Sequence, residues 1–232
     1  MITFRPAGER GRTQFDWLDS WHSFSFGGYY DPEHTGFGPL RVINDDVIAP
    51  GGGFSTHGHR DMEIITHVLS GALEHKDSLG TGSVIAAGDV QKMSAGKGIL
   101  HSEFNVSDRH PVHLLQIWIE PDTKSIPPSY QQITPQWQGA SGWKLVASQD
   151  GRDGSIWVKR DVTLSIAKPK AGEKLAYSIP AGRRVWLHVG AGEAKLDGHA
   201  LKQGDAVALE NESSLNVEAV KDDTTLLLFD LP

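Results

Sequence analysis

The sequence contains no cysteine among its 232 residues. Disulfide bonds, thiolate zinc sites, iron–sulfur clusters and a cysteine nucleophile are therefore excluded. A metal ion, if the protein binds one, has to be held by histidine nitrogens and by oxygen ligands. The chain is long enough to bury a core of ordinary size in one or two domains, so its stability does not require covalent cross-links.

Positive charge and long apolar runs are also scarce. The sequence has 22 Lys and Arg against 29 Asp and Glu, a formal net charge of −7. This charge disfavours non-specific electrostatic binding to nucleic acid or anionic lipid. The amino-terminal segment, MITFRPAGERGR, lacks the apolar core of a secretory signal, and no stretch approaches the roughly 18 consecutive apolar residues of a membrane span. We expect a cytoplasmic protein with no direct nucleic-acid partner and no membrane association.

Long amphipathic helical periods are missing too, and short β-branched runs take their place. The 26 glycines and 12 prolines separate these runs into strand-length pieces. Pieces that recur every 8 to 20 residues or so, with no helix between them, favour an antiparallel sandwich or barrel over βαβ units. The predicted fold class is all-β. The strands expected in the first half cover residues 21–26, 40–45, 63–69, 83–88 and 113–119.

Residues 120–142 interrupt the strand pattern with prolines, glutamines and small polar residues, as an inter-domain linker does. Strand-like runs then resume, and each half carries a Gly-Asp pair in a predicted hairpin, at Gly88-Asp89 and Gly204-Asp205. The two halves therefore look like loose repeats of one design. We predict an N-terminal domain over 1–125, a linker over 126–142 and a C-terminal domain over 143–232.

The first informative segment is GGGFSTHGHRDME, which contains a His-x-His pair. Successive side chains of an extended strand alternate between its two faces, so His57 and His59 share one face. If the strand continues, Asp61 and Glu63 lie on that face as well. A lone His-x-His arises often by chance in a sequence with 11 histidines, so this pair alone is weak support for a metal site.

A second segment, KGILHSEFN, offers a matching pair some forty residues later. His101 and Glu103 share a face for the same reason. Two such pairs are hard to explain as solvated surface, and clustering them without a partner inside a β-protein would be costly. Three imidazoles and a carboxylate suit iron, manganese, nickel, copper or cobalt and leave coordination positions open for catalysis.

These segments resemble the two sequence motifs of the cupins. The first motif is matched by Gly51, His57, His59 and Glu63, with its last glycine one position late at Gly71. The second motif is matched by Gly88, Gly96, His101 and Asn105, with Ser94 where proline is common and two extra residues before the histidine.

Within the cupins the chain is most similar to the pirin family, whose members share these departures. The segments WLDSWHSFSFGGYYDP, LRVINDD, STHGHRDMEIIT, MSAGKGILHSEFN and LQIWI follow the pirin pattern in order, and GRRVWLHVGAG with LLLFDLP extends it into the second half. The resemblance implies a bicupin, with two tandem antiparallel β-barrel domains of the jelly-roll kind. The second half contains no His-x-His or His-x-Glu pair, so we expect only the first domain to carry a metal ion.

The resemblance also implies the ligand set. His57, His59, His101 and Glu103 match the positions that hold the metal in pirins, whereas other cupins use a carboxylate at the position of Glu63. The sequence alone permits either carboxylate, and we assign Glu103 to the metal and Glu63 to a neighbouring structural role. The expected cofactor is one divalent transition-metal ion, with iron as the first choice and copper, nickel, manganese, cobalt or zinc as the others.

Bacterial pirins resemble quercetin 2,3-dioxygenases, so the leading hypothesis is metal-dependent oxidation of a flavonol by dioxygen. The substrate hydroxyl would bind the metal, and Glu103 would be the catalytic residue that removes the hydroxyl proton. The alternative is a metal-binding regulatory protein that contacts a transcription factor or an enzyme as its protein partner, without physiological turnover. We expect a monomer in either case.

Other histidines and aromatic residues have simpler interpretations. His67 and His113 lie inside strand-like runs and are expected to be packed or hydrogen-bonded in the core, and His75 is expected at a strand end. Phe24 and Phe26 are expected to be core residues, with the lining of an aromatic substrate pocket as the alternative.

Overall fold

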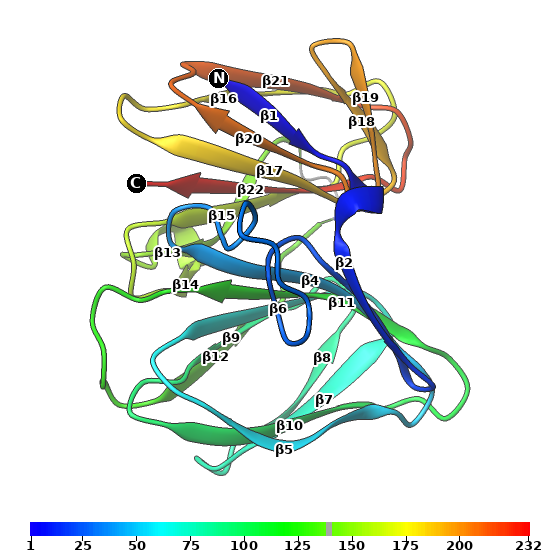
Figure 1. The fold of residues 1–232 in the computed structure, drawn as a ribbon, viewed down its shortest axis with the longest axis vertical. Coiled ribbons are helices and arrows are strands. Elements are labelled where there is room, and N and C mark those ends of the chain that lie inside the picture. Colours follow the sequence, from blue (N-terminus) through cyan, green and yellow to red (C-terminus); the bar gives the residue numbers. More distant parts are fainter. Residues whose placement is uncertain (138–140) are drawn as a thin grey trace. The chain divides into compact units, whose positions relative to one another are not determined.

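The structure is a computed structural model that describes residues 1–137 and 141–232, and it consists almost entirely of β-strands (Figure 1). In these residues the only helical pieces are two short 3-10 turns, η1 (Ala7–Glu9) and η2 (Arg152–Gly154). None of the described residues belongs to a helix that is long and apolar enough to cross a membrane. The prediction of a nearly all-β fold is confirmed.

The chain divides into two compact units. The N-terminal unit contains Gly11–Pro135 together with Ile156–Arg160, and the C-terminal unit contains Met1–Arg10, Gln136–Ser155 and Asp161–Pro232. Part of the expected linker forms a strand, and its residues 138–140 lie outside the described residues. The domain limits 1–125, 126–142 and 143–232 stay a prediction.

The N-terminal unit holds two antiparallel sheets. The larger runs in the order β12-β9-β6-β11-β4-β3-β2 and the smaller in the order β5-β10-β7-β8. The strands of the unit are β2 (Gly11–Phe15), β3 (Leu18–His22), β4 (Leu40–Ile48), β5 (Gly53–His59), β6 (Glu63–Ser70), β7 (Ala72–Asp77), β8 (Gly82–Ala86), β9 (Val90–Ser94), β10 (Ile99–Asn105), β11 (Val112–Ile119), β12 (Ser129–Ile133) and β14 (Ile156–Trp157).

The C-terminal unit repeats this plan. Its larger sheet contains the order β1-β20-β17-β22-β15-β13, and its smaller sheet runs β16-β21-β18-β19. The sheets of neither unit are closed, so the barrel part of the prediction stays a prediction. The strands are β1 (Ile2–Arg5), β13 (Lys144–Ser148), β15 (Thr163–Ala167), β16 (Lys174–Ser178), β17 (Arg184–Ala191), β18 (Glu193–Leu196), β19 (His199–Lys202), β20 (Ala206–Glu210), β21 (Ser214–Ala219) and β22 (Thr225–Leu231).

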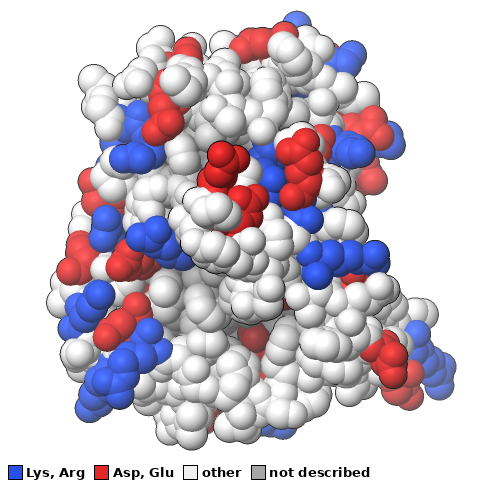
Figure 2. Space-filling view, viewed as in Figure 1, with Lys and Arg blue, Asp and Glu red and all other residues white. Residues whose placement is uncertain are grey.

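Most of the strands expected from apolar runs form within a few residues of their predicted limits. The exception is the run 21–26, because the strand ends at His22 and the chain then leaves the sheet. Phe24 becomes a core residue that is 2% exposed, as the simpler interpretation expected. Figure 2 shows that acidic and basic side chains are interspersed on the face in view rather than gathered by sign.

On three neighbouring strands of the larger N-terminal sheet, β3, β4 and β11, alternate side chains point to the same inner face. Asp46 of β4 pairs with Ser20 of β3, and Asn44 of β4 pairs with both His22 of β3 and Gln116 of β11. Directly opposed residues point to the same side of a sheet, so these polar side chains share a face. A cluster of buried apolar residues from both sheets packs the two sheets against each other: Leu18, Ile48, Val68, Val112 and Leu114 from the larger sheet, and Leu73 and Ile85 from the smaller.

Candidate metal centre and cavity

Two neighbouring strands bring the three predicted histidines together. β5 and β10 run side by side in the smaller sheet (Figure 1). His57 on β5 pairs directly with His101 on β10. The ring centroids of His57 and His59 are 4.8 Å apart, those of His57 and His101 are 4.4 Å apart, and those of His59 and His101 are 4.8 Å apart. One nitrogen of each ring falls within 4.8 Å of the others. The strand-alternation argument therefore placed these three side chains correctly.

A β-bulge in β5 adds an aromatic side chain to the same wall. His101 pairs with His57 but Glu103 pairs with Phe54, so β5 carries one extra residue over this stretch. In a regular strand, side chains three residues apart would face opposite sides, and Phe54 would point away from His57. The bulge lets both face the interior of the unit.

Glu103 is held in a fixed orientation. Its side chain is 3% exposed, and the Gln116 amide nitrogen donates to both carboxylate oxygens, at 3.2 and 3.0 Å. The Thr66 hydroxyl donates to the Gln116 amide oxygen at 2.7 Å, which fixes the amide with its nitrogen toward Glu103. Burial raises the pKa of Glu103 to about 7, against the opposing effect of the Gln116 hydrogen bond.

His75 lies beside Glu103, a neighbour that was not predicted from the sequence. β7 pairs with β10 so that His75 is opposite Glu103 and Asp77 is opposite His101. Ligand atoms of His75, His101 and Glu103 lie within 4.8 Å of one another and form a second group that shares His101 with the first. His75 was expected only at a strand end. The missing signal was the pairing of β7 with β10, because β7 has no histidine motif of its own.

The second group extends to Asp77, whose carboxylate is buried beside His75. His75 is fully buried, its Nε2 lies 3.2 Å from Asp77 Oδ2, and its Nδ1 lies 3.5 Å from His101 Nδ1. The other Asp77 oxygen accepts hydrogen bonds from the backbone N–H groups of Leu79 and Thr81. These two hydrogen bonds from the turn after β7 fix the orientation of the Asp77 carboxylate that faces His75.

The residues at this centre fit a divalent transition-metal ion. His57 Nδ1 lies 2.8 Å from the backbone oxygen of Ser55, so Nδ1 carries the proton and Nε2 keeps its lone pair for a metal. His101 Nε2 is a buried nitrogen without a hydrogen-bond partner in the structure. Burial lowers the pKa of His59 to about 4 and that of His101 to about 2, so both rings are neutral and can ligate at neutral pH.

A cavity of about 360 Å³ opens onto this cluster from between the two sheets of the N-terminal unit. His57, His59 and Glu103 line one part of it, and the polar inner face of the larger sheet lines another. Its apolar walls are aromatic for the most part. The lining residues are Thr13, Phe15, Leu18, Ser20, His22, Phe26, Gly27, Gly28, Asn44, Asp46, Phe54, His57, His59, Glu103, Gln116 and Trp118.

Two acidic residues that the extended-strand argument placed beside the histidines lie elsewhere. Asp61 has a positive φ of 50°, which ends the alternation after His59, and its side chain accepts a hydrogen bond from the backbone N–H of Ser125. Glu63 begins β6 in the larger sheet, where it is 1% exposed and accepts a hydrogen bond from Ser94. The prediction that Asp61 and Glu63 share the histidine face was therefore wrong.

The remaining predicted histidines and aromatic residues have defined places. His67 Nδ1 lies 2.9 Å from the backbone oxygen of Asp89, and His113 Nε2 lies 2.6 Å from Asp45 Oδ1, so both are hydrogen-bonded within the unit as expected. Phe26 lines the cavity and packs edge-on against Trp118. The pocket interpretation therefore applies to Phe26 and not to Phe24.

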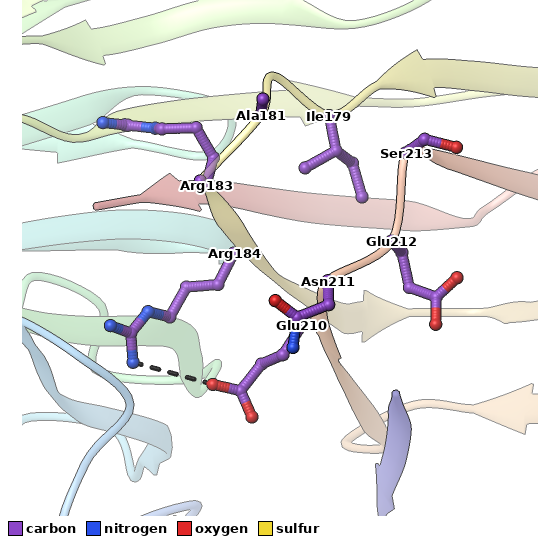
Figure 3. A pocket seen from close by; sticks show the side chains of 9 residues that line it. Ile179, Ala181, Arg183, Arg184, Glu210, Asn211, Glu212 and Ser213 are labelled. Carbon is purple, nitrogen blue, oxygen red and sulfur yellow. Dashed lines mark ion pairs between the residues drawn. The ribbon is translucent and has the colours of Figure 1, made fainter.

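A second hollow, of about 390 Å³, lies in the C-terminal unit (Figure 3). Its lining residues belong to β17, to β20 and to the turns beside these strands, and they include no histidine. Its two arginines are already paired, Arg184 with Glu210 at 3.7 Å and Arg183 with Asp161 at 2.8 Å. Among the described residues, both groups of side chains that could hold a metal ion lie in the N-terminal unit. A metal-free C-terminal unit stays a prediction.

Comparisons with known proteins cover both halves of the chain. Residues 3–119 match the family model described as Pirin, and residues 145–231 match the model described as Quercetinase C-terminal cupin domain. A relative from Escherichia coli K12, named quercetin 2,3-dioxygenase, is 47% identical over 232 residues, which are 100% of this chain and 99% of the relative. A Pasteurella multocida protein named putative quercetin 2,3-dioxygenase is 40% identical and is covered completely, as is this chain.

The structural comparison agrees with the sequence comparison. The crystal structure of the bacterial pirin YhhW from Escherichia coli in complex with nickel(II) superposes with a TM-score of 0.94 at 47% identity. The match covers 100% of this chain and 99% of that one. The two units are therefore cupin-type domains.

Proposed function

The chain belongs to the pirin family, and on that premise we propose that it is a metal-dependent dioxygenase of flavonols, similar to quercetin 2,3-dioxygenase. One observation carries the proposal. The cavity has aromatic walls, and His57, His59 and Glu103 line one part of it. Pockets of a few hundred Å³ with apolar walls and a few polar groups are typical sites for small aromatic ligands. The names of the relatives support the same reaction.

In this proposal His57, His59, His101 and Glu103 hold one divalent transition-metal ion. When bound, a redox-active ion would supply a Lewis acid for the substrate hydroxyl and a redox partner for dioxygen, whereas zinc would supply the Lewis acid alone. Iron is our first choice, and copper, nickel, manganese, cobalt and zinc are the others. A related pirin was crystallised with nickel(II). Elemental analysis of protein purified without added metal tests this choice.

Glu103 is the proposed catalytic residue. Its carboxylate accepts the proton of the substrate hydroxyl, so the substrate reacts as an oxygen anion. Burial raises the pKa of Glu103 to about 7 in the metal-free protein. A bound cation would favour the charged carboxylate, so the group would meet the substrate deprotonated and able to accept a proton. The Gln116 amide donates to both oxygens of the carboxylate and so holds it in one orientation while the proton moves.

The aromatic residues around the opening have a separate role. Phe15, Phe26, Phe54 and Trp118 contribute apolar surface to the cavity. A planar substrate stacked among them would displace water from the reacting hydroxyl, which strengthens the electrostatic interactions at Glu103.

The alternative is a metal-bearing regulatory protein that binds a transcription factor or an enzyme. A closed metal pocket together with an exposed apolar patch would favour that function. The open aromatic cavity beside the histidines supports the enzyme instead. A protein partner, the monomeric state and a cytoplasmic location stay predictions.

The test of the function is oxygen consumption. Purified protein is stripped of metal, reloaded separately with iron, copper, nickel, manganese or cobalt, and mixed with a panel of flavonols. We expect oxygen uptake with at least one metal, and its loss in His57→Ala, which removes a proposed ligand. Absence of uptake with every metal and every flavonol would refute the proposal.

A further inference from the structure

Asp46 is a buried carboxyl group in the cavity wall with an unused hydrogen-bonding oxygen. The residue is 2% exposed, and its side chain interacts with the Ser20 hydroxyl on the neighbouring strand. Its Oδ1 has no hydrogen-bond partner in the structure. Burial raises the pKa of Asp46 to about 7, as expected for a carboxyl group that has lost water and gained only one partner.

The polar neighbours of Asp46 are occupied by one another. The Thr13 hydroxyl lies 2.9 Å from His22 Nε2, and the Asn44 amide oxygen lies 2.8 Å from His22 Nδ1. The Gln116 amide nitrogen donates its hydrogen bonds to Glu103. They do not compete for the unused oxygen.

Among the described residues that line the cavity, the only other buried side-chain polar atom without a partner is Trp118 Nε1. Native proteins leave few such groups unpaired, and those that remain often have their partner in a ligand or in bound water. The cavity therefore offers one acceptor and one N–H donor that the protein itself does not satisfy.

The two polar parts of the cavity lie on different sheets of the N-terminal unit. Asp46 lies on β4 of the larger sheet, whereas His57 and His59 lie on β5 of the smaller sheet, and all three line the same cavity. A single planar molecule stacked on the aromatic walls would thus meet the histidine cluster with one group and Asp46 with another. A molecule with only one polar group would leave Asp46 unpaired.

We propose that Asp46 recognises a second hydroxyl group of a polyhydroxylated aromatic substrate, one hydroxyl of which faces the histidine cluster. This inference rests on the proposed function, and it assigns the substrate class: aromatic compounds that carry a hydroxyl donor for Asp46 in addition to the reacting hydroxyl. A site with a buried group that pairs with a substrate hydroxyl rejects analogues that lack the hydroxyl, because the buried group is then left unpaired.

The experiment measures binding rather than turnover. Nickel-loaded protein is titrated without oxygen with quercetin and with 3-hydroxyflavone, which shares the ring system and the 3-hydroxyl but lacks the other hydroxyls. Quenching of tryptophan fluorescence reports the dissociation constants. We expect the wild type to bind quercetin at least about tenfold more tightly. Asp46→Leu and Asp46→Ala, which both remove the acceptor oxygen, should lose most of this preference by weakening quercetin binding alone.

Asp45→Asn is the matched control. Asp45 precedes Asp46 on β4 and pairs with His113, and it is not among the cavity-lining residues. This variant should keep the wild-type preference. Thermal unfolding of each variant identifies any that fail to fold, and Asp46→Leu, which fills more of the space of the original side chain, then stands in for Asp46→Ala.

The outcomes separate the inference from the proposed function. Loss of the preference in both Asp46 variants supports the inference, whether or not the wild type consumes oxygen in air. An unchanged preference in both variants overturns it, even if oxygen is consumed. A wild type that binds the two compounds equally, or binds neither, overturns it as well.

Discussion

His75 Nδ1 lies 3.5 Å from His101 Nδ1, and the opposite nitrogen of His75 lies 3.2 Å from Asp77. A carboxylate accepts hydrogen bonds, so His75 Nε2 carries the proton and His75 Nδ1 is the acceptor. His101 must then donate from its own Nδ1, which leaves the buried Nε2 of His101 with a lone pair. The Asp77–His75 pair thus selects the His101 tautomer that can ligate a metal ion through Nε2.

This relationship predicts a large effect for Asp77→Asn. Backbone N–H groups hold the position of Oδ1, so the new amide oxygen stays there and the amide NH₂ faces His75 Nε2. His75 then carries its proton on Nδ1, opposite the Nδ1 proton of His101. We expect nickel affinity to fall about 10- to 100-fold, as for other groups that orient metal-binding histidines. Competition with a chelator measures the change.

Asp45→Asn is again the control, because it alters a histidine–carboxylate pair in the same unit away from the three clustered histidines. Nitrogen-15 NMR of the metal-free protein should show His101 protonated on Nδ1 in the wild type. The tautomer assignment is wrong if Asp77→Asn leaves both the NMR signals and the nickel affinity unchanged.

Removal of a proposed ligand should release the metal and preserve the fold. His57→Ala and His101→Ala each leave two of the three clustered imidazoles, and we expect both variants to purify with far less than one metal ion per chain. The large apolar core of the unit does not include these residues, so the circular-dichroism spectrum should stay that of a β-protein. His110→Ala, at an exposed position, should retain its metal. Stoichiometric metal in both ligand variants would rule out the assignment.

Metal binding should release a proton from Glu103 at slightly acidic pH. With its pKa raised to about 7, this carboxyl is largely protonated at pH 6 in the metal-free protein and must lose its proton to ligate. The contribution of Glu103 is close to one proton at about pH 6 and approaches zero above about pH 8. Calorimetric titration with nickel in buffers of different ionisation enthalpy measures it. Glu103→Gln should lack this contribution, and an equal release in both proteins would contradict the prediction.

Gln116→Leu should shift that release to higher pH. The substitution removes the two hydrogen bonds that stabilise the charged form of Glu103, so its pKa rises further. Leaving the buried carboxyl without a donor should also cost about 1–3 kcal/mol of stability, measured by urea unfolding. Thr66→Val, which removes only the bond that orients the Gln116 amide, should give a smaller change in the same direction.

The histidine cluster could be found from the sequence because it depends on local periodicity. Alternation within β5 and within β10 fixes which side chains share a face, and it gave His57, His59 and His101 correctly. It failed at Asp61, where a positive φ ends the strand before Glu63. Two-residue spacing carries no information on where a strand stops.

The groups around the cluster could not be found in this way, because they come from strand pairing. His75 and Asp77 reach the site through the pairing of β7 with β10, and Asp46 lies on another sheet. In the sequence each of them is one polar residue within an otherwise ordinary strand. Only the order of strands in the sheets shows that they face a common interior.

The extra residue in β5 makes the length of this strand as important as its composition. Phe54 and His57 face the same cavity only because an additional residue separates them. Deleting Ser55 or Thr56 would restore regular pairing with β10 and turn one of these two side chains outward, although neither would have been altered chemically. Among functional homologues, insertions and deletions should therefore be rarer between these two positions than in the turns at either end of the strand.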